Sequence, residues 1–257
     1  MDMYSKHYLV TGGTSGIGLE LVKLLHRKGH QLTLLIRDIG KAQLKFPENS
    51  FPNINFVMCD LNDKDAIQNL FVQFRDKGTK FDGFIHSAGI GYFKSLDAHT
   101  PDEVLTTYQL NTIHFALLLN TIKPYLNAQP QIVAMSSMSG LATQPNAAHY
   151  AASKAGLNHI LNALRFEEPS YHVLNVLLGP VKTPFHDHSD PEGKYKKKLA
   201  LFMLHPQKVV QSIVQAMDSK KNELYAPKWM ACLLKIYQIA PRFIEKLAKP
   251  LFMSKMK

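Results

Sequence analysis

A strand, a glycine-rich turn and a helix follow one another at the start of this 257-residue chain. His7-Tyr-Leu-Val10 is a short apolar strand, and helical spacing of apolar residues runs from 19 to Gly29. Between them, the glycines follow the pattern G-x-x-x-G-x-G. Glycines let backbone amides approach a pyrophosphate, whose charge the positive end of the helix stabilises. We therefore predict a dinucleotide site at this turn, made by Gly12, Thr14, Ser15, Gly16, Ile17 and Gly18.

Strands and helices alternate along the rest of the chain. Further strands are expected at 31–36, 55–59, 82–86, 131–135, 173–178 and 223–226. Helices are expected at 63–74, at 100–123 with Asn111 inside it, from Tyr150 onward, and at 206–217. Such alternation is typical of α/β proteins with a doubly wound sheet. We predict a Rossmann-like fold with a mostly parallel seven-stranded sheet, helices on both faces, and residues 1–226 as one domain.

Composition indicates what kind of protein this chain is, and its net charge indicates which partners it could bind. Hydrophobic residues make up 46% of the chain and charged residues 19%, as in ordinary globular proteins. Cys59 and Cys232 give no disulfide framework, and no apolar run could span a bilayer, so we expect a cytoplasmic protein. The net charge of +10 suits nucleic acid, an anionic substrate or an anionic membrane surface. Nucleic acid is disfavoured because no binding module is recognisable.

Residues near the second and third strand ends indicate which dinucleotide is bound. Ile36 stands where an acid would bind the ribose of NAD, and Arg37 follows, where arginine accommodates a 2′-phosphate. NADP(H) is therefore favoured over NAD(H). Asp38 is either a turn residue or a helix cap. Asp60 and Leu61 either meet the adenine or form a turn or cap, and the small residues Ser87, Ala88 and Gly89 would let the cofactor lie close to the backbone.

Tyr150-Ala-Ala-Ser-Lys154 places a phenol and an ammonium one turn apart on a helix face. A cation held beneath the phenol stabilises phenolate and lowers its pKa, and bringing that pKa near neutrality takes roughly 3–4 kcal/mol. Such a phenol acts as a general acid or base on a carbonyl or an alcohol. Ser137 lies upstream, at the carboxyl end of the fifth predicted strand, where such sheets place ligands.

Taken together and in this order, these motifs resemble the short-chain dehydrogenase/reductase family, in its compact single-domain branch, over about residues 5–226. The glycine turn is similar to the family's cofactor motif, and His86-Ser87-Ala88-Gly89 to its Asn-Asn-Ala-Gly element. Gly179-Pro180-Val-Lys-Thr183 resembles its nicotinamide loop, with the usual Pro-Gly order inverted. The resemblance implies that Pro180, Val181 and Thr183 contact the nicotinamide.

Four residues match the family's catalytic tetrad: Asn111, Ser137, Tyr150 and Lys154. The resemblance implies that Tyr150 is the acid/base, and that Lys154 lowers its pKa and binds the nicotinamide ribose. Ser137 would bond the substrate oxygen, and Asn111 would help to hold a water that relays protons. His86 and Ser87 replace paired asparagines, which puts some hydrogen bonds beneath the sheet in doubt.

The expected activity is that of an NADP(H)-preferring oxidoreductase that interconverts a ketone or aldehyde and an alcohol by hydride transfer. The substrate is expected to be apolar or lipid-like, and the assembly a homodimer or homotetramer. Two alternatives stay open: a catalytically silent nucleotide-sensing protein on the same fold, and an NAD-dependent epimerase or dehydratase. No metal is expected, because His186-Asp-His188 lacks a third ligand at a suitable spacing.

Two segments outside these motifs also carry expectations. Residues 184–205 are polar and lysine-rich, and are expected to form a mobile flap over the site. The C-terminal tail, residues 227–257, combines apolar bulk with basic residues, a pattern typical of helices in an anionic membrane interface, here broken at Pro241 and Pro250. Docking on the domain, a dimer contact or a cover for the substrate pocket is the alternative. The expected pocket mouth contains Tyr92, Phe93, Leu141, Phe185, Leu201 and Phe202.

Overall fold

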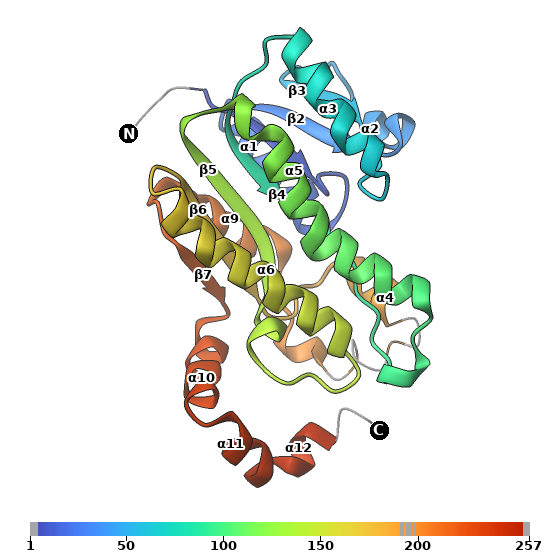
Figure 1. The fold of residues 1–257 in the computed structure, drawn as a ribbon, viewed down its shortest axis with the longest axis vertical. Coiled ribbons are helices and arrows are strands. Elements are labelled where there is room, and N and C mark those ends of the chain that lie inside the picture. Colours follow the sequence, from blue (N-terminus) through green and yellow to red (C-terminus); the bar gives the residue numbers. More distant parts are fainter. Residues whose placement is uncertain (1–4, 191–192, 194–196, 198, 254–257) are drawn as a thin grey trace.

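The computed structural model describes residues 5–190, 193, 197 and 199–253, which form three layers with a sheet between two sets of helices (Figure 1). Seven strands make one sheet in the order β3-β2-β1-β4-β5-β6-β7. All six neighbouring pairs are parallel. The predicted Rossmann-like, doubly wound fold is confirmed, and the sheet is parallel throughout rather than mostly so.

All seven predicted strands are present, with small shifts at their ends. They are β1 (His7–Thr11), β2 (Gln31–Ile36), β3 (Ile54–Met58), β4 (Phe81–His86), β5 (Leu126–Ser137), β6 (His172–Leu178) and β7 (Glu223–Ala226). The largest shift is in β5, which begins five residues before the predicted start. Its first residues are largely exposed, so they lack the apolar pattern by which the buried part was found.

Helices cover both faces of the sheet. The main ones are α1 (Gly16–Arg27), α2 (Ile39–Lys45), α3 (Lys64–Asp76), α4 (Pro101–Tyr108), α5 (His114–Ile122), α6 (Ala148–Glu167) and α9 (Pro206–Asp218). Shorter segments are η1 (Leu96–Ala98), η2 (Gln109–Ile113), η3 (Lys123–Tyr125), η4 (Met138–Leu141), α7 (Phe185–Ser189) and η5 (Ala200–Phe202). Of the predicted flap, residues 191–192, 194–196 and 198 lie outside the described part of the chain.

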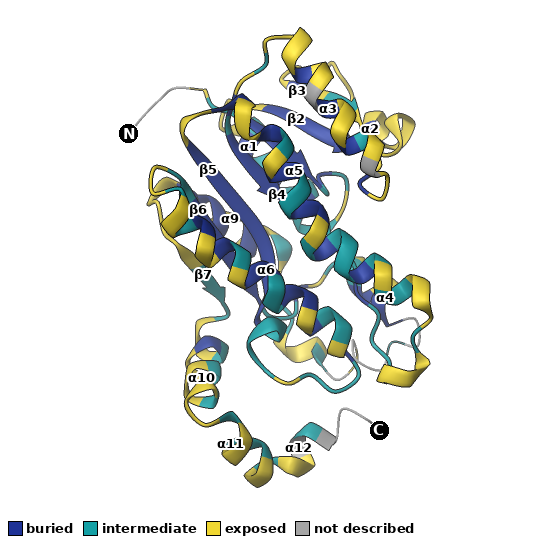
Figure 2. Ribbon diagram, in the orientation of Figure 1, coloured by how far each residue is buried: buried dark blue, intermediate teal, exposed yellow. Residues whose placement is uncertain are grey.

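Two hydrophobic layers hold the helices to the sheet. Leu21 of α1 and Ile213 of α9 belong to the layer on one face, whereas Phe115 of α5 and Leu161 of α6 belong to the layer on the other. All four side chains are fully buried. The inner strands β1, β2, β4, β5 and β6 are consequently buried over most of their length, as Figure 2 shows, whereas the edge strands β3 and β7 are only partly buried. Burial from both sides explains why the inner strands are apolar runs instead of alternating patterns.

The predicted helix at 100–123 is interrupted near its middle. It begins with a capping box, in which Thr100 Oγ1 accepts from the Glu103 amide at 3.3 Å and Glu103 Oε2 accepts from the Thr100 amide at 2.8 Å. After α4, the segment η2 is a π-helical turn that contains Asn111, and α5 follows it. Such turns occur mostly as single bulges within α-helices and often mark functional sites.

The described part of the tail, residues 227–253, forms three helices after β7: α10 (Lys228–Ile239), α11 (Pro241–Leu247) and α12 (Lys249–Met253). The predicted breaks lie next to Pro241 and Pro250, each of which stands at or near the first position of a new helix. Figure 1 shows these helices leaving the domain after β7 and curving along one end of it. No helix of the described residues is both long and apolar enough to cross a membrane.

Candidate active site

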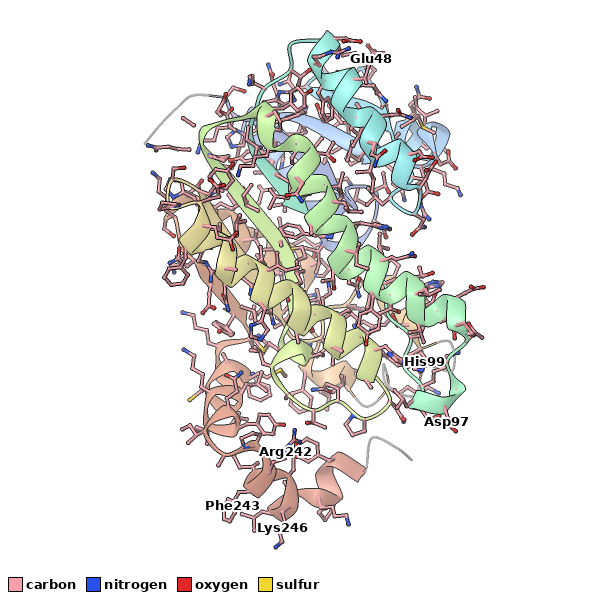
Figure 3. All side chains as sticks on the ribbon, viewed as in Figure 1. Glu48, Asp97, His99, Arg242, Phe243 and Lys246 are labelled. Atoms are coloured by element: carbon pink, nitrogen blue, oxygen red, sulfur yellow. The ribbon has the colours of Figure 1, made fainter. Side chains whose placement is uncertain are left out.

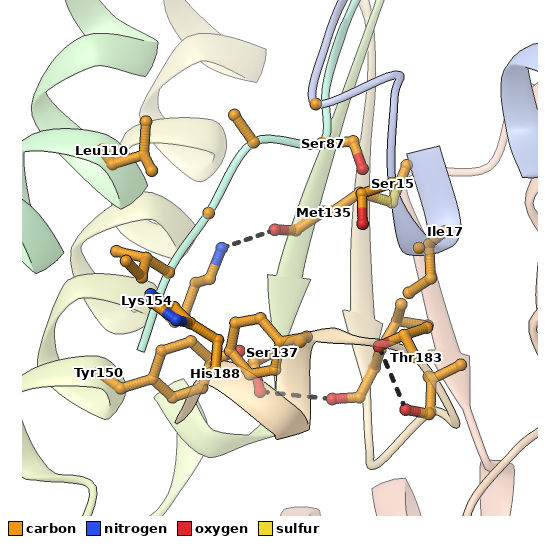
Figure 4. Close-up of a pocket in the computed structure, with 18 of the residues that line it drawn as sticks. Ser15, Ile17, Ser87, Leu110, Met135, Ser137, Tyr150, Lys154, Thr183 and His188 are labelled. Atoms are coloured by element: carbon orange, nitrogen blue, oxygen red, sulfur yellow. Dashed lines mark hydrogen bonds between the residues drawn. The ribbon is translucent and has the colours of Figure 1, made fainter. Parts of the chain in front are cut away.

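A cavity of about 710 Å³ lies along the carboxyl ends of the central strands (Figure 4). The residues after β1, β2, β3, β4, β5 and β6 all contribute to its lining, as expected for a parallel α/β sheet. Nearly every predicted cofactor contact lines it: Gly12, Thr14, Ser15, Gly16, Ile17, Arg37, Asp60, Leu61, Ser87, Ala88, Gly89, Tyr150, Lys154, Pro180, Val181 and Thr183. The structure therefore brings together residues that lie up to 171 positions apart in the sequence, from Gly12 to Thr183.

The glycine turn depends on glycine at the positions where the backbone packs most closely. Gly12 has a φ of +66°, and a Cβ there would lie 2.5 Å from the Ala88 amide nitrogen. A Cβ on Gly18 would lie 2.2 Å from the Gly12 carbonyl oxygen. Gly18 was predicted to contact the cofactor, but it does not line the cavity. It lies beneath the turn and lets α1 approach it closely. Its contact with the cofactor stays a prediction.

Arg37 and Asp60 lie at the end of the cavity formed by β2 and β3. Arg37 is exposed, and Asp60 Oδ1 accepts a hydrogen bond from the Asn62 amide at 3.0 Å while the residue also lines the cavity. Asp38 is a helix cap, because its Oδ1 accepts from the Lys41 amide at 3.0 Å at the start of α2. The second of the two interpretations of Asp38 is therefore correct.

Two lysines beside this end were missed in the sequence. A second hollow, next to the glycine turn, is lined by Thr14, Ser15, Lys41, Leu44 and Lys45. The lysines lie four residues apart on α2, a spacing that places them on one helix face. That spacing could have been recognised, but the direction of this face depends on how α2 packs.

Tyr150 stands near the start of α6 with its ring among aromatic side chains. Its ring centroid lies 5.7 Å from that of Phe93 and 5.6 Å from that of Phe185. Burial raises the pKa of Tyr150, and a hydrogen bond with Ser137 acts in the opposite direction. Ser137 ends β5, where its Oγ accepts from the Ser139 amide at 3.1 Å and donates to the Leu178 carbonyl at 3.4 Å.

Lys154 is buried, and its ammonium donates a hydrogen bond to the Met135 carbonyl at 2.8 Å. The ammonium lies 6.0 Å from the centroid of the Tyr150 ring. In the protein without cofactor, removal of the phenol from water outweighs the hydrogen bond with Ser137 and raises the pKa of Tyr150. The lowering of this pKa by Lys154 together with the nicotinamide stays a prediction. Burial also lowers the pKa of Lys154, to about 8.

Asn111 lies behind the cavity instead of lining it. Its Oδ1 accepts from the Ile90 amide at 2.9 Å, and its Nδ2 donates to the Ile90 carbonyl at 2.8 Å and to Ser153 Oγ at 2.9 Å. Ser153 Oγ in turn donates to the Tyr150 carbonyl at 2.8 Å. Asn111 therefore holds the loop after β4 against the first turn of α6, the turn that carries Tyr150.

His86, which stands where the family has an asparagine, makes a hydrogen-bonding contact beneath the glycine turn. Its Nδ1 lies 3.0 Å from Thr11 Oγ1, and the same hydroxyl accepts from the Ala88 amide at 3.3 Å. These contacts join the ends of β1 and β4 beneath the glycine turn. Complete burial, with the nearby charge of Lys154, lowers the pKa of His86 to about 3, so the ring is neutral.

The other end of the cavity is mainly apolar. Of the predicted mouth residues, Phe93 and Phe185 line it, but Tyr92, Leu141, Leu201 and Phe202 do not. The sequence analysis missed Leu110 and, from the tail, Met230 and Leu234. The spacing of Met230, Leu234 and Tyr237 is that of one helix face, but only the packing of α10 shows that this face meets the domain. His186 and His188 line the cavity, and no described residues form a cluster of three potential metal ligands.

Comparison with known proteins identifies the family. The family model for short-chain dehydrogenases matches residues 6–193. The chain belongs to the short-chain dehydrogenase family. The predicted resemblance and the expectation of an NAD(P)-dependent oxidoreductase are thereby confirmed at the level of this family.

Among the relatives within the family is a probable short-chain type dehydrogenase/reductase of Helicobacter pylori, VdlC. It is 29% identical over 68% of this chain and 65% of its own length. A 3beta-hydroxysteroid dehydrogenase of Mediterraneibacter gnavus is 26% identical over 87% of this chain and 82% of its own. The fold is shared with a short-chain dehydrogenase/reductase from Burkholderia phymatum in complex with NAD, at a TM-score of 0.82 and 16% identity, over 95% and 96% of the two chains. A short-chain dehydrogenase from Sphingobium yanoikuyae in complex with NADPH has a TM-score of 0.78 at 20% identity, over 94% and 95%.

Proposed function

We propose that this protein is an NADP(H)-preferring oxidoreductase that interconverts a ketone or aldehyde and an alcohol by hydride transfer. The observation that carries the proposal is the arrangement of the cavity. One end has the glycine turn, and Ser137, Tyr150 and Lys154 lie along the other side of the same space. Residues 1–226 would form the catalytic unit and residues 227–257 an extension of it.

The residues at the first turn of α1 fit a dinucleotide. Gly12 and Gly16 have positive φ angles, and the side chain of Ser15 makes no capping hydrogen bond to the helix. The first amides of α1 therefore stay available to an anion, and the glycine turn leaves the room that a pyrophosphate needs. The bound cofactor supplies or accepts the hydride.

The chain's own residues would orient the substrate and move the proton. The Ser137 hydroxyl would donate to the substrate oxygen, and the Tyr150 phenol would protonate that oxygen as charge develops on it. The phenol is protonated at neutral pH, as a proton donor to the substrate oxygen must be. Lys154 would hold the ribose with its ammonium, and Asn111 would position Tyr150 through Ser153.

The preference for NADP(H) is supported by the charges around the adenosine end. Arg37 lines the cavity and Lys45 lines the neighbouring hollow, where Lys41 also pairs with Asp38 at 3.4 Å, so the local charge favours a 2′-phosphate. Ile36 leaves no carboxylate at the position that would bind the ribose hydroxyls of NAD. Asp38 is engaged in capping α2, so it does not take over that role. Solved relatives of this fold hold NAD in one case and NADPH in another, so the fold itself admits both.

An apolar substrate is supported by the side chains opposite the glycine turn. Phe93, Leu110, Phe185, Met230 and Leu234 line that part of the cavity. A relative named as a 3beta-hydroxysteroid dehydrogenase acts on a substrate of this kind. We infer a secondary alcohol or ketone with a large apolar body.

Two free cysteines agree with a cytoplasmic, reducing location. The resemblance to the compact branch of the family supports a homodimer or homotetramer.

The test is turnover of NADPH and NADH with a panel of ketones that vary in apolar size. The proposal predicts consumption of NADPH at a higher kcat/KM than NADH, increasing with the apolar size of the ketone. Tight nucleotide binding without turnover of any ketone or alcohol would favour the silent nucleotide-sensing alternative. A product isomerised or dehydrated without net oxidation of the cofactor would favour the epimerase or dehydratase.

A further inference from the structure

The helix α10 carries two neighbouring apolar rows with different surroundings. Met230, Leu234 and Tyr237 form the row that meets the domain, and all three are half-buried. Trp229, Leu233 and Ile236 form the next row, and each is more than half exposed. Residues three and four positions apart share a helix face, so this second row is a continuous apolar strip that faces away from the cavity.

The strip continues past the end of α10. Ile239 at the end of α10, and Phe243 and Leu247 on α11, are each more than half exposed. Figure 3 shows Phe243 on the side of α11 that is turned away from the sheet. We call Trp229, Leu233, Ile236, Ile239, Phe243 and Leu247 the outer apolar face. Soluble chains rarely leave so many large apolar side chains together without a partner surface.

The charges that surround this face indicate the chemistry of its partner. Lys228, Lys235, Arg242, Lys246 and Lys249 are exposed, and Figure 3 shows Lys246 on the outward side of α11. The only acid in residues 228–249 is Glu245. Lysine is depleted in protein–protein interfaces, so a second copy of the chain or another protein is a poor fit to this mixture. Apolar side chains bordered by lysines are typical of helices that lie in the interface of an anionic bilayer.

Glu245 serves to fix the tail in place. It accepts hydrogen bonds from Thr143 Oγ1, Tyr237 and Arg242, each at 2.6 Å. These bonds, of which the one from Thr143 has the largest effect, lower the pKa of Glu245 to about 2. The Thr143 amide also donates to the Tyr237 hydroxyl at 3.2 Å. The tail is therefore fastened to the segment after η4, and the direction of its outer face is set relative to the domain.

We propose that α10 and α11 bind the surface of an anionic lipid bilayer, with the outer apolar face in the interface and the lysines at the headgroups. The neighbouring row of α10 forms part of the wall of the cavity through Met230 and Leu234. The bound orientation would place that wall beside the lipid, where an apolar ketone or alcohol dissolves. This link to catalysis rests on the proposed function, whereas membrane binding does not.

Trp229 provides a direct measurement, because it is the only tryptophan of the chain and lies on the outer apolar face. The full-length protein is mixed with vesicles of phosphatidylcholine alone and with vesicles that also contain the anionic lipid phosphatidylserine. With the anionic vesicles, Trp229 emission is expected to shift to the blue and the protein to sediment with the lipid. Both effects should weaken as salt screens the lysines.

Matched variants distinguish binding through the outer apolar face and its lysines from non-specific electrostatic or hydrophobic binding to the vesicles. Lys228→Gln with Lys246→Gln and Lys249→Gln should lower partitioning about 100-fold, because each lysine near such a surface contributes about fivefold. Lys77→Gln with Lys208→Gln and Lys221→Gln removes the same charge elsewhere and should leave partitioning close to that of the unaltered protein. Leu233→Ser with Ile236→Ser should abolish sedimentation, whereas Phe166→Ser, at an exposed apolar residue outside the tail, should not.

Three results would overturn the proposal. The first is equal partitioning of the unaltered protein and the Leu233→Ser, Ile236→Ser variant. The second is a blue shift that follows protein concentration in the absence of lipid, since it would assign the outer apolar face to a second copy. The third is equal binding to neutral and anionic vesicles. Tyr150→Phe should bind vesicles as well as the unaltered protein does, so a failure of the proposed catalysis is distinguishable from a failure of membrane binding.

Discussion

The Lys154 ammonium donates a hydrogen bond to the Met135 carbonyl at 2.8 Å, which joins helix α6 to strand β5 within the cavity. Met135 lies two residues before Ser137, so this bond fixes the distance between the helix that carries the phenol and the strand that carries the hydroxyl. A Cβ on Gly89 would lie 3.3 Å from the Lys154 ammonium, so the loop after β4 also closes on the lysine. The ammonium is thus enclosed by β5 and by the loop after β4, and its removal from water disfavours the charged form.

The first prediction concerns the dependence of stability on pH without cofactor. Burial lowers the pKa of Lys154 from 10.5 to about 8, so between these values the unfolded chain binds more protons than the folded one. The free energy of unfolding should therefore rise with pH in this window and receive no such contribution below it. Measured by urea titration, the free energy of unfolding of the unaltered protein should increase by about 1.5 kcal/mol more than that of Lys154→Met between pH 8 and 9.5. If the free energy of unfolding changes with pH in the same way in both proteins, burial does not lower the pKa of Lys154.

The second prediction concerns the packing beneath the glycine turn. In Gly18→Ala the added Cβ would lie 2.2 Å from the Gly12 carbonyl oxygen, so the turn must shift. We expect NADPH affinity, measured by calorimetry, to fall at least about tenfold, with a loss of about 1–3 kcal/mol of stability. Gly40→Ala is the control, because its Cβ would meet only Asp38 Oδ1 at 3.5 Å within α2. Unchanged NADPH affinity in Gly18→Ala would show that Gly18 is not needed for the shape of the turn.

The sequence predicts the sheet well because the signals are local. Buried parallel strands are apolar runs, and β2 and β7 occupy the predicted residues because turns bound them on both sides. The glycine turn was likewise placed correctly, since its requirement for open backbone is a property of a few adjacent residues. Gly18 shows the limit of this reasoning, because its proximity to the Gly12 carbonyl depends on how α1 meets the turn.

The electrostatics of the site were less predictable. The spacing of Tyr150 and Lys154 gives a shared helix face, but the direction of the Tyr150 pKa shift depends mainly on burial, which the sequence does not show. The π-helical turn around Asn111 has no clear signal in an apolar helix, and the hydrogen bond that Asn111 accepts from the Ile90 amide joins segments 21 residues apart. Met230 belongs to the tail, and nothing in the sequence indicates that it lines the cavity, because its position depends on how α10 packs on the domain.

The third prediction concerns the choice of cofactor. Arg37→Ala should weaken NADPH binding about 10- to 100-fold, because a charge-assisted hydrogen bond contributes about 1.5–3 kcal/mol. NADH lacks the 2′-phosphate, so its affinity should stay the same. Arg75→Ala, an exposed arginine away from the cavity, serves as the control. Equal weakening of both cofactors, or of neither, would remove Arg37 from the basis of the preference.

The fourth prediction concerns the wall that α10 contributes to the cavity. Leu234→Ala should raise the KM for a large apolar ketone about fivefold, since about 1 kcal/mol of apolar contact is lost from a half-buried side chain. The KM for NADPH and the kcat should change little. Leu233→Ala is the matched control, because this adjacent leucine is exposed and lies outside the cavity lining. The same KM in both variants would mean that α10 does not contact the substrate.

The central claim is that the Tyr150 phenol moves the proton during hydride transfer, and a single-turnover measurement with Tyr150→Phe tests it most directly. With saturating NADPH and a ketone that the unaltered protein reduces, the rate should fall about 100- to 10,000-fold, while NADPH affinity stays within about threefold. Tyr92→Phe, outside the cavity lining, should leave the rate unchanged. Reduction by Tyr150→Phe at the rate of the unaltered protein would contradict this account of the site.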